Sequence, residues 1–438
     1  MELLIVFLLF LSCMAVCLGL GITMLLPLAV GFGLFFLLAA KKGHRPKEVL
    51  KMAAGTLPES FIVIQVMLLI GCLTGLWRSC GTIAYFVSFG VGLMPPTMFL
   101  LAAFLLSSVM SYALGTSFGV TATCGVILMA IARAGGVNPL LAAGAVYSGV
   151  YVGDRGSPAA SSGNLVAAVT GTDMRQNVRQ MIPSSVLPFL LCCGIYGVLS
   201  VFFPMGSADV SVLIRLRGAF SLHWTCLIPA VLMLVLPFCG VPVKGSMAVS
   251  IVASFAVAMA VQGQGFFQTL WAMIAGYVPA QESLTAMLSG GGVVSMLEVS
   301  GILLISGTYG GIFRETGMLT PVTDRLQAMA GKIGRYPAML LMSFVLCAMF
   351  CNQTISTIMQ SQLSAPLYGL EEKEEKMLDL ENSAIMTAAL IPWCIACSVP
   401  FGMMGVGPKA LLFGFYPMLL PLCFCIKRVR EQRKQRTP

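Results

Sequence analysis

The stretch VYSGVYVGDRGSPAASSGNL, residues 146–165, indicates how the chain is organised. An apolar run ends in Asp154, the only acidic residue between Glu59 and Asp173. An ionisable group at membrane depth costs at least ~2.5–3.5 kcal/mol, so it usually faces a cavity or a partner. A glycine and a proline follow at once and break the helix, which frees backbone carbonyls to point at a cation. The stretch therefore predicts a broken membrane helix with a functional carboxylate at the break.

Oxygen-bearing side chains follow Asp154 in the next segment: Ser157, Ser161, Ser162 and Asn164. Such hard ligands suit Na⁺. A carboxylate in this pocket binds either a proton or a metal cation, and mutual exclusion of the two is the simplest coupling device for antiport. We predict a cation- and substrate-binding site here, with Asp154 as the Na⁺ ligand. The alternative is that Asp154 merely pairs with Arg155 at a helix end near the membrane interface.

The composition requires a lipid environment. Of 438 residues, 58% are hydrophobic and 10% are charged, and the mean hydropathy is +0.92. A soluble domain carries about 25% charged residues, so the excess apolar surface must face a bilayer. No folded basic face is available for nucleic acid, so that class of partner is excluded. The 15 cysteines lie mostly in apolar runs and lack metal-binding spacing.

Apolar stretches long enough to cross a membrane (about 20 residues) recur along the whole chain. They predict an all-α polytopic membrane protein with roughly 10–13 transmembrane helices. Shorter segments at 111–134, 153–172 and 352–366 suit broken helices or re-entrant hairpins. The predicted spans are 2–20, 22–40, 60–77, 84–110, 137–152, 182–204, 222–240, 245–262, 293–313, 336–351, 383–402 and 408–426.

The two halves of the chain resemble each other. LIGCLTGLWRSCG (69–81) aligns with ISGTYGGIFRETG (305–317), and SSVMSYALGTSFG (107–119) aligns with SFVLCAMFCNQTI (343–355), both at a shift of about 236 residues. Two matches in the same order indicate a duplication. We predict a first transmembrane repeat at 1–205, a linker at 206–221, a second repeat at 222–426 and a basic tail at 427–438.

The charge pattern indicates that the repeats are inverted. The loop at 41–51 holds five cations, whereas its second-half equivalent, between the predicted spans 245–262 and 293–313, holds no Lys or Arg. Cytoplasmic loops of one half thus correspond to external loops of the other, and inverted repeats place the substrate site at their interface near the midplane. Because the basic tail is also cytoplasmic by this rule, we predict a multi-pass protein of a prokaryotic cell membrane with both termini in the cytoplasm. We also expect the first apolar run to be a membrane helix and not a cleaved signal.

Polar residues end apolar helices at equivalent places in the two halves. Asn352, Gln353 and Thr354 follow one such helix, and Thr116 begins the matching first-half cluster. Side chains of this kind either line a cavity or form an interhelical hydrogen-bond seam. Trp393, in the Gly- and Pro-rich segment 391–407, is a pocket wall or an interfacial anchor. We assign Thr116, Asn352, Gln353, Thr354 and Trp393 to the cation- and substrate-binding site.

The same motifs resemble a known family. GDRGSPAASSGNL (153–165), CNQTISTIMQSQLSAPLY (351–368) and LENSAIMTAALIPWC (380–394) are similar to stretches of the NhaC family of Na⁺/H⁺ antiporters, in the same order. The matching positions include Asp154, Asn352, Glu381 and Trp393. The chain departs from the family pattern at 161–163, where Ser, Ser and Gly replace an acidic residue and two threonines, and at Cys394, where the family has Asn.

The resemblance implies a secondary transporter that exchanges cytoplasmic Na⁺ for external H⁺, and we see no enzyme constellation. Without that acidic residue the site has less negative charge to bind a bare cation, so an alternative to Na⁺/H⁺ exchange has to be considered. In that alternative, the same scaffold carries a small organic anion or amino acid coupled to Na⁺ or H⁺. A channel is a third reading, disfavoured because discontinuous repeats suit alternating access. No cofactor is expected beyond the transported ions, and a homo-oligomer remains open.

Overall fold

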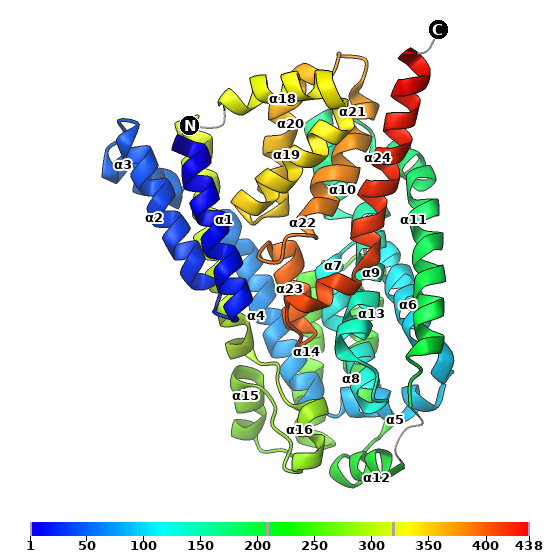
Figure 1. Ribbon diagram of the computed structural model, residues 1–438. Helices are drawn as coiled ribbons and strands as arrows, with labels where there is room; N and C mark the ends of the chain where they lie inside the picture. Colours follow the sequence, from blue (N-terminus) through cyan, green and yellow to red (C-terminus); the bar gives the residue numbers. More distant parts are fainter. Residues whose placement is uncertain (1, 94, 207–209, 318–319, 437–438) are drawn as a thin grey trace.

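The computed structural model describes residues 2–93, 95–206, 210–317 and 320–436, and these fold into a bundle of helices (Figure 1). The prediction of an all-α membrane protein is confirmed. In chain order the helices are α1 (Glu2–Leu20), α2 (Leu25–Lys41), α3 (Pro46–Ala54), α4 (Leu57–Ser79), α5 (Thr82–Leu93), α6 (Phe99–Leu114), α7 (Ser117–Val120), α8 (Val126–Ala134), α9 (Pro139–Gly156), α10 (Ser161–Thr170), α11 (Met174–Phe202), α12 (Val210–Ala219), α13 (Ile228–Phe238), α14 (Val243–Ala260), α15 (Phe266–Ala275), α16 (Glu282–Leu288), α17 (Leu297–Thr316), α18 (Thr320–Ile333), α19 (Arg335–Phe350), α20 (Gln353–Leu363), α21 (Lys373–Leu380), α22 (Met386–Ala388), α23 (Ile395–Met403) and α24 (Phe415–Arg436).

Several helices are long and apolar enough to cross a membrane. Five described helices are each long and apolar enough by themselves: Pro96–Leu114, Ser117–Ala134, Met174–Phe202, Val243–Ala260 and Val293–Thr316. Helices α4 and α5 are long and apolar enough only when they are taken together, as one span that bends by 63° at the break between them. Shorter apolar helices, such as α1, α2 and α19, complete the bundle. The chain is therefore a multi-pass membrane protein in which many helices are interrupted instead of crossing straight.

Helices of the first half recur in the same order in the second half, again offset by about 236 residues. Thus α6 corresponds to α19, α10 to α23 and α11 to α24. Figure 1 shows that equivalent elements lie at opposite ends of the molecule: α3 and α18 are at the upper end, whereas their counterparts α16 and α5 are at the lower end. This exchange of ends is what an inverted repeat requires.

Each half contains a helix that breaks and restarts at the equivalent residue. Helix α6 ends at Gly115 (φ 65°), and α19 ends at Cys351 (φ 55°). Cys351 is the one non-glycine residue with a positive φ in the described part of the chain. The next residue is extended in both halves, with φ −148° at Thr116 and −139° at Asn352, and it caps the helix that follows. The predicted discontinuities near 111 and 352 are confirmed.

Two predicted spans were wrong in their extent. The span at 84–110 is two helices, α5 and α6, separated by the Pro95–Pro96 pair, because proline cannot donate the backbone hydrogen bond that would continue α5. The span at 383–402 is likewise split, since α22 ends at Ala388 and α23 begins only at Ile395. The segment between them contains Pro392, so the same cause applies.

Candidate functional site

Close packing of α9 against α6 positions Asp154. A Cβ atom on Gly149 would lie 2.5 Å from the carbonyl oxygen of Phe104, and one on Gly153 would lie 2.0 Å from the carbonyl carbon of Ser111. Only glycine allows such an approach. The crossing therefore holds the C-terminal end of α9, with Asp154, directly against the break at the end of α6.

The Asp154 carboxylate meets the start of a restarted helix. Its Oδ1 accepts hydrogen bonds from the Ser117 backbone N–H (3.2 Å) and from Ser117 Oγ (3.1 Å). Ser117 is the first residue of a continuous run of helix, Ser117–Ala134, whose N-terminal dipole favours a negative charge. The side chain is 5% exposed, and Oδ2 has no hydrogen-bond partner among the described residues. One oxygen is anchored, and the other is available to a proton or a cation.

Arg155 does not pair with Asp154. Its guanidinium donates to the hydroxyls of Ser184 and Ser185 on α11, and the side chain is fully buried. No ion pair between Arg155 and a carboxylate occurs in the described part of the chain. The alternative in which Asp154 is merely neutralised by its neighbour at an interface is therefore wrong.

Of the predicted residues after Asp154, one touches it. The Ser162 hydroxyl donates to the main-chain carbonyl of Asp154. Ser157 is buried but accepts a bond from the Ala159 N–H (3.1 Å). Ser161 and Asn164 are exposed on α10, and the Asn164 amide donates to its own helix. The structure thus brings Ser162 to the backbone of Asp154 and leaves Ser161 and Asn164 away from it.

The second-half cluster divides in the same way. Gln353, the first residue of α20, donates to the Ile385 carbonyl (3.1 Å) and interacts electrostatically with Asp154, which joins the two repeats. Asn352 uses its Oδ1 to cap α20, just as Thr116 caps α7. Thr354 is exposed. Trp393 donates to the Ala348 carbonyl (2.9 Å), so it ties the segment after α22 to the end of α19.

A buried acid that sequence motifs did not assign to the site is Glu381. It opens a wide π-type turn, η6 (Glu381–Ile385), and turns of this kind occur frequently at functional sites. It is fully buried, and neither carboxylate oxygen has a partner among the described residues. In the sequence, the preceding EEKEEK run favours a solvated loop and so points away from a buried site at Glu381. The feature that could have identified Glu381 is the stretch 380–394, which resembles the family motif.

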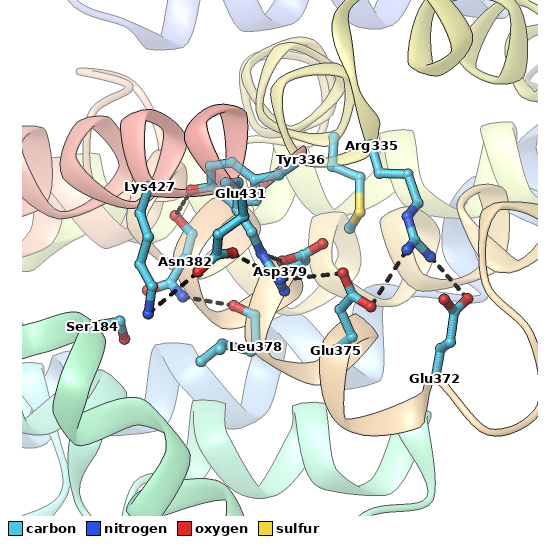
Figure 2. A network of polar contacts seen from close by, with 12 residues as sticks. Ser184, Arg335, Tyr336, Glu372, Glu375, Leu378, Asp379, Asn382, Lys427 and Glu431 are labelled. Atoms are coloured by element: carbon cyan, nitrogen blue, oxygen red, sulfur yellow. Dashed lines mark hydrogen bonds and ion pairs between the residues drawn. The ribbon is translucent and has the colours of Figure 1, made fainter. Parts of the chain in front are cut away.

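A network of ion pairs fixes the helix that leads into Glu381 (Figure 2). Arg428 of α24 contacts Asp379 (2.8 Å) and Glu375 (3.2 Å). Arg335 joins the same network through Glu372 (2.8 Å) and Glu375 (3.4 Å). Burial raises the pKa of Asp379 to about 6, although the Arg428 guanidinium and the Tyr368 hydroxyl oppose that shift. These contacts hold α21 against α24 and α19 at the end of the molecule that carries both termini (Figure 1).

The fold and the site together define a class of protein. A multi-pass bundle of repeated, broken helices carries a buried carboxylate at the meeting point of its two halves, and this is the architecture of a secondary transporter. Residues 149–407 match the family model of the Na⁺/H⁺ antiporter family, which covers more than half of the chain and includes both Asp154 and Glu381. The chain belongs to the Na⁺/H⁺ antiporter family.

Characterised relatives differ in what they exchange. The chain is 24% identical over 396 residues to the malate-2H⁺/Na⁺-lactate antiporter of Bacillus subtilis (strain 168), covering 88% of this chain and 85% of that protein. It is 25% identical over 341 residues to the arginine/ornithine antiporter ArcD of Halobacterium salinarum, covering 75% and 70%. It is 23% identical over 373 residues to the Na⁺/H⁺ antiporter NhaC of Alkalihalophilus pseudofirmus, covering 82% and 79%.

Proposed function

We propose that the protein exchanges cytoplasmic Na⁺ for external H⁺, with Asp154 as the group that carries each in turn. The observation that carries this proposal is the buried Oδ2 of Asp154, which lacks a partner while Oδ1 is held by Ser117. A carboxylate fixed in this way offers one open position. A proton and a cation exclude each other there, which is the condition for obligatory exchange.

The neighbours of Asp154 favour a small cation at this position. The two Ser117 donors and the helix N-terminus stabilise the negative charge, so the carboxylate stays available as a hard ligand. Gln353 contributes a side chain from the other repeat, so an ion bound at Asp154 interacts with both halves of the molecule. Coupling of both repeats to one ion suits alternating access. No further cofactor is part of the proposal.

Flux in proteoliposomes tests the proposal. An internal pH dye reports proton movement when Na⁺, K⁺ or an organic acid is added outside to vesicles that contain the full-length protein. We expect proton efflux on addition of Na⁺, and we expect Asp154→Asn to abolish it. Asp173→Asn is the matched control: Asp173 caps α11 with its carboxylate, and asparagine caps equally well. A Na⁺ response that survives in Asp154→Asn removes Asp154 from the mechanism.

A second candidate is supported by Arg155. Its buried guanidinium donates to two serine hydroxyls, and its Nε has no partner in the described part of the chain. An organic anion would pair with this group, and two of the relatives are named for organic substrates. Proton movement driven by a carboxylate solute, without a response to Na⁺ alone, would favour this function over Na⁺/H⁺ exchange.

A further inference from the structure

Glu381 is unusual for a buried carboxylate because no described residue donates a hydrogen bond to it. Its side chain is fully buried, and both oxygens lack a hydrogen-bond donor among the described residues. An isolated carboxylate in a protein interior costs several kcal/mol when ionised, so such a group holds a proton or binds a cation. Asp154 differs, because its Oδ1 already has two donors.

The polar side chains next to Glu381 have hydrogen-bond partners, so Glu381 is not part of a loosely packed region. In the same turn, the Asn382 amide donates to the Leu378 carbonyl (2.8 Å) and the Ser383 hydroxyl donates to the Asp379 carbonyl (2.6 Å). Figure 2 shows Asp379 and Glu375 within the ion-pair network, where Arg428 contacts both. Arg428 and Arg335 are thus engaged with other acids, and neither forms an ion pair with Glu381 in the described part of the chain.

Helix α10 connects Glu381 to Asp154. Ser162 donates to the main-chain carbonyl of Asp154, and a Cβ atom on the next residue, Gly163, would lie 3.5 Å from Glu381 Oε1. The two acids therefore lie beside consecutive residues of one helix. Glu381 also interacts electrostatically with Asp154, which repels it, and with Arg155, which attracts it.

The charges of these three groups determine when Glu381 can ionise. With both acids ionised and Arg155 cationic, the site carries one net negative charge. A Na⁺ ion on Asp154 cancels that charge and its field supplies the attraction that Glu381 lacks from hydrogen bonds. Without Na⁺, the least costly form of Glu381 is the protonated one. Binding of Na⁺ at one acid thus favours loss of a proton from the other.

We propose that Glu381 is a second proton-carrying residue of the transport site, separate from the proton that competes with Na⁺ at Asp154. The proposal rests on the proposed Na⁺/H⁺ exchange. Each cycle then takes up a proton on Glu381 from one side and releases it on the other as Na⁺ binds. Because an additional proton moves for each Na⁺, net charge crosses the membrane in each cycle.

Two measurements of the number of protons coupled to each Na⁺ test this proposal on the full-length protein. In weakly buffered detergent solution, a pH dye counts the protons released per Na⁺ bound. In proteoliposomes, the Na⁺ gradient that balances a set pH gradient and membrane potential gives the coupling ratio. We expect Glu381→Gln to lower both quantities by one proton per Na⁺ and to remove the dependence of exchange on membrane potential. Glu381→Asp restores a carboxylate, so it should recover the lost proton at least in part.

The outcomes separate the two proposals. If the wild type releases no protons on addition of Na⁺, the Na⁺/H⁺ exchange fails and the role of Glu381 fails with it. If the wild type exchanges Na⁺ for H⁺ and Glu381→Gln has an unchanged coupling ratio, the role of Glu381 alone is overturned. Should Glu381→Gln not fold, infrared difference spectra of the wild type with and without Na⁺ decide instead. Loss of two protonated carboxyl signals on Na⁺ binding supports the proposal, and loss of only one overturns it.

Discussion

Substituting Gly153 by alanine should separate the two helices that hold the candidate site. The added Cβ atom would lie 2.0 Å from the Ser111 carbonyl carbon and 2.1 Å from the Tyr112 nitrogen. Ordinary van der Waals contact begins at 3.4 Å. Both neighbours are backbone atoms, so no side-chain rotation relieves the clash, and α6 and α9 must move apart by more than about 1 Å. That movement takes Asp154 away from Ser117.

The change in the free energy of unfolding has two components of opposite sign. Overpacking a close helix contact costs about 1–3 kcal/mol, or more where backbone must move. Replacing glycine by alanine inside a helix returns at most about 1 kcal/mol. We therefore expect Gly153→Ala to lower the free energy of unfolding by about 1–2 kcal/mol. A misplacement of about 1 Å at a reacting group costs ~10²-fold in rate, so we expect Na⁺-driven proton flux to fall by a similar factor.

Thermal unfolding in detergent and flux in proteoliposomes measure the two effects. The matched control is Gly194→Ala in α11, where a Cβ atom would meet nothing within 4 Å. We expect the control to be as stable as the wild type or slightly more stable, with full flux. If Gly153→Ala behaves like this control in both assays, the close crossing of α6 and α9 does not position Asp154 as argued.

Three further predictions concern other parts of the molecule. Ser117→Ala removes the hydroxyl that donates to Asp154, so we expect about 1–3 kcal/mol weaker stabilisation of the ionised carboxylate and a lower apparent Na⁺ affinity in flux assays; unchanged affinity would contradict it. Burial raises the pKa of Asp379 to about 6 from 3.8, so its protonated form stabilises the folded state below about pH 4, and this contribution, up to about 3 kcal/mol, is lost as pH rises to about 6. Between about pH 4 and about pH 6, the free energy of unfolding of the wild type should fall relative to that of Asp379→Asn, and a pH-independent difference between the two would refute the assignment. Tags at the two chain ends should be reached by a protease from the same side of the membrane, which we expect to be the cytoplasmic side, because the start of α1 and the end of α24 lie at the same end of the molecule (Figure 1).

The main features of the fold were accessible from the sequence because they depend on local chemistry. Gly115 and the polar residues after it mark a break in any apolar helix, and the second half repeats the pattern at Cys351. Hydropathy could not place the division between α5 and α6, since the Pro95–Pro96 pair lies within an apolar stretch with no charge to mark it. Whether a proline kinks a membrane helix or ends it depends on its neighbours in space.

The candidate site was only partly accessible, for a different reason. Asp154 stands alone in an apolar run, so its burial follows from its position in the sequence. Ser161 and Ser162 are adjacent and chemically identical, yet only Ser162 reaches Asp154, because successive residues on a helix point about 100° apart. Glu381 follows a strongly charged run, and only tertiary packing shows that its side chain is buried while its neighbours on α21 form ion pairs.

The position of Ser161 bears on the ion that the site can hold. The resembling family has an acidic residue at that position, and its absence suggests a weaker cation site. In the structure, however, Ser161 is exposed at the start of α10, whereas Asp154 and Glu381 are both buried and lie beside the next two residues of that helix. An acid at an exposed position is screened by water and contributes little to a buried ion. Under the proposed exchange, the buried negative charge at the cation comes from Asp154, and from Glu381 once it has released its proton, and it does not depend on residue 161. Ser161→Asp should therefore change the apparent Na⁺ affinity far less than Asp154→Asn or Glu381→Gln.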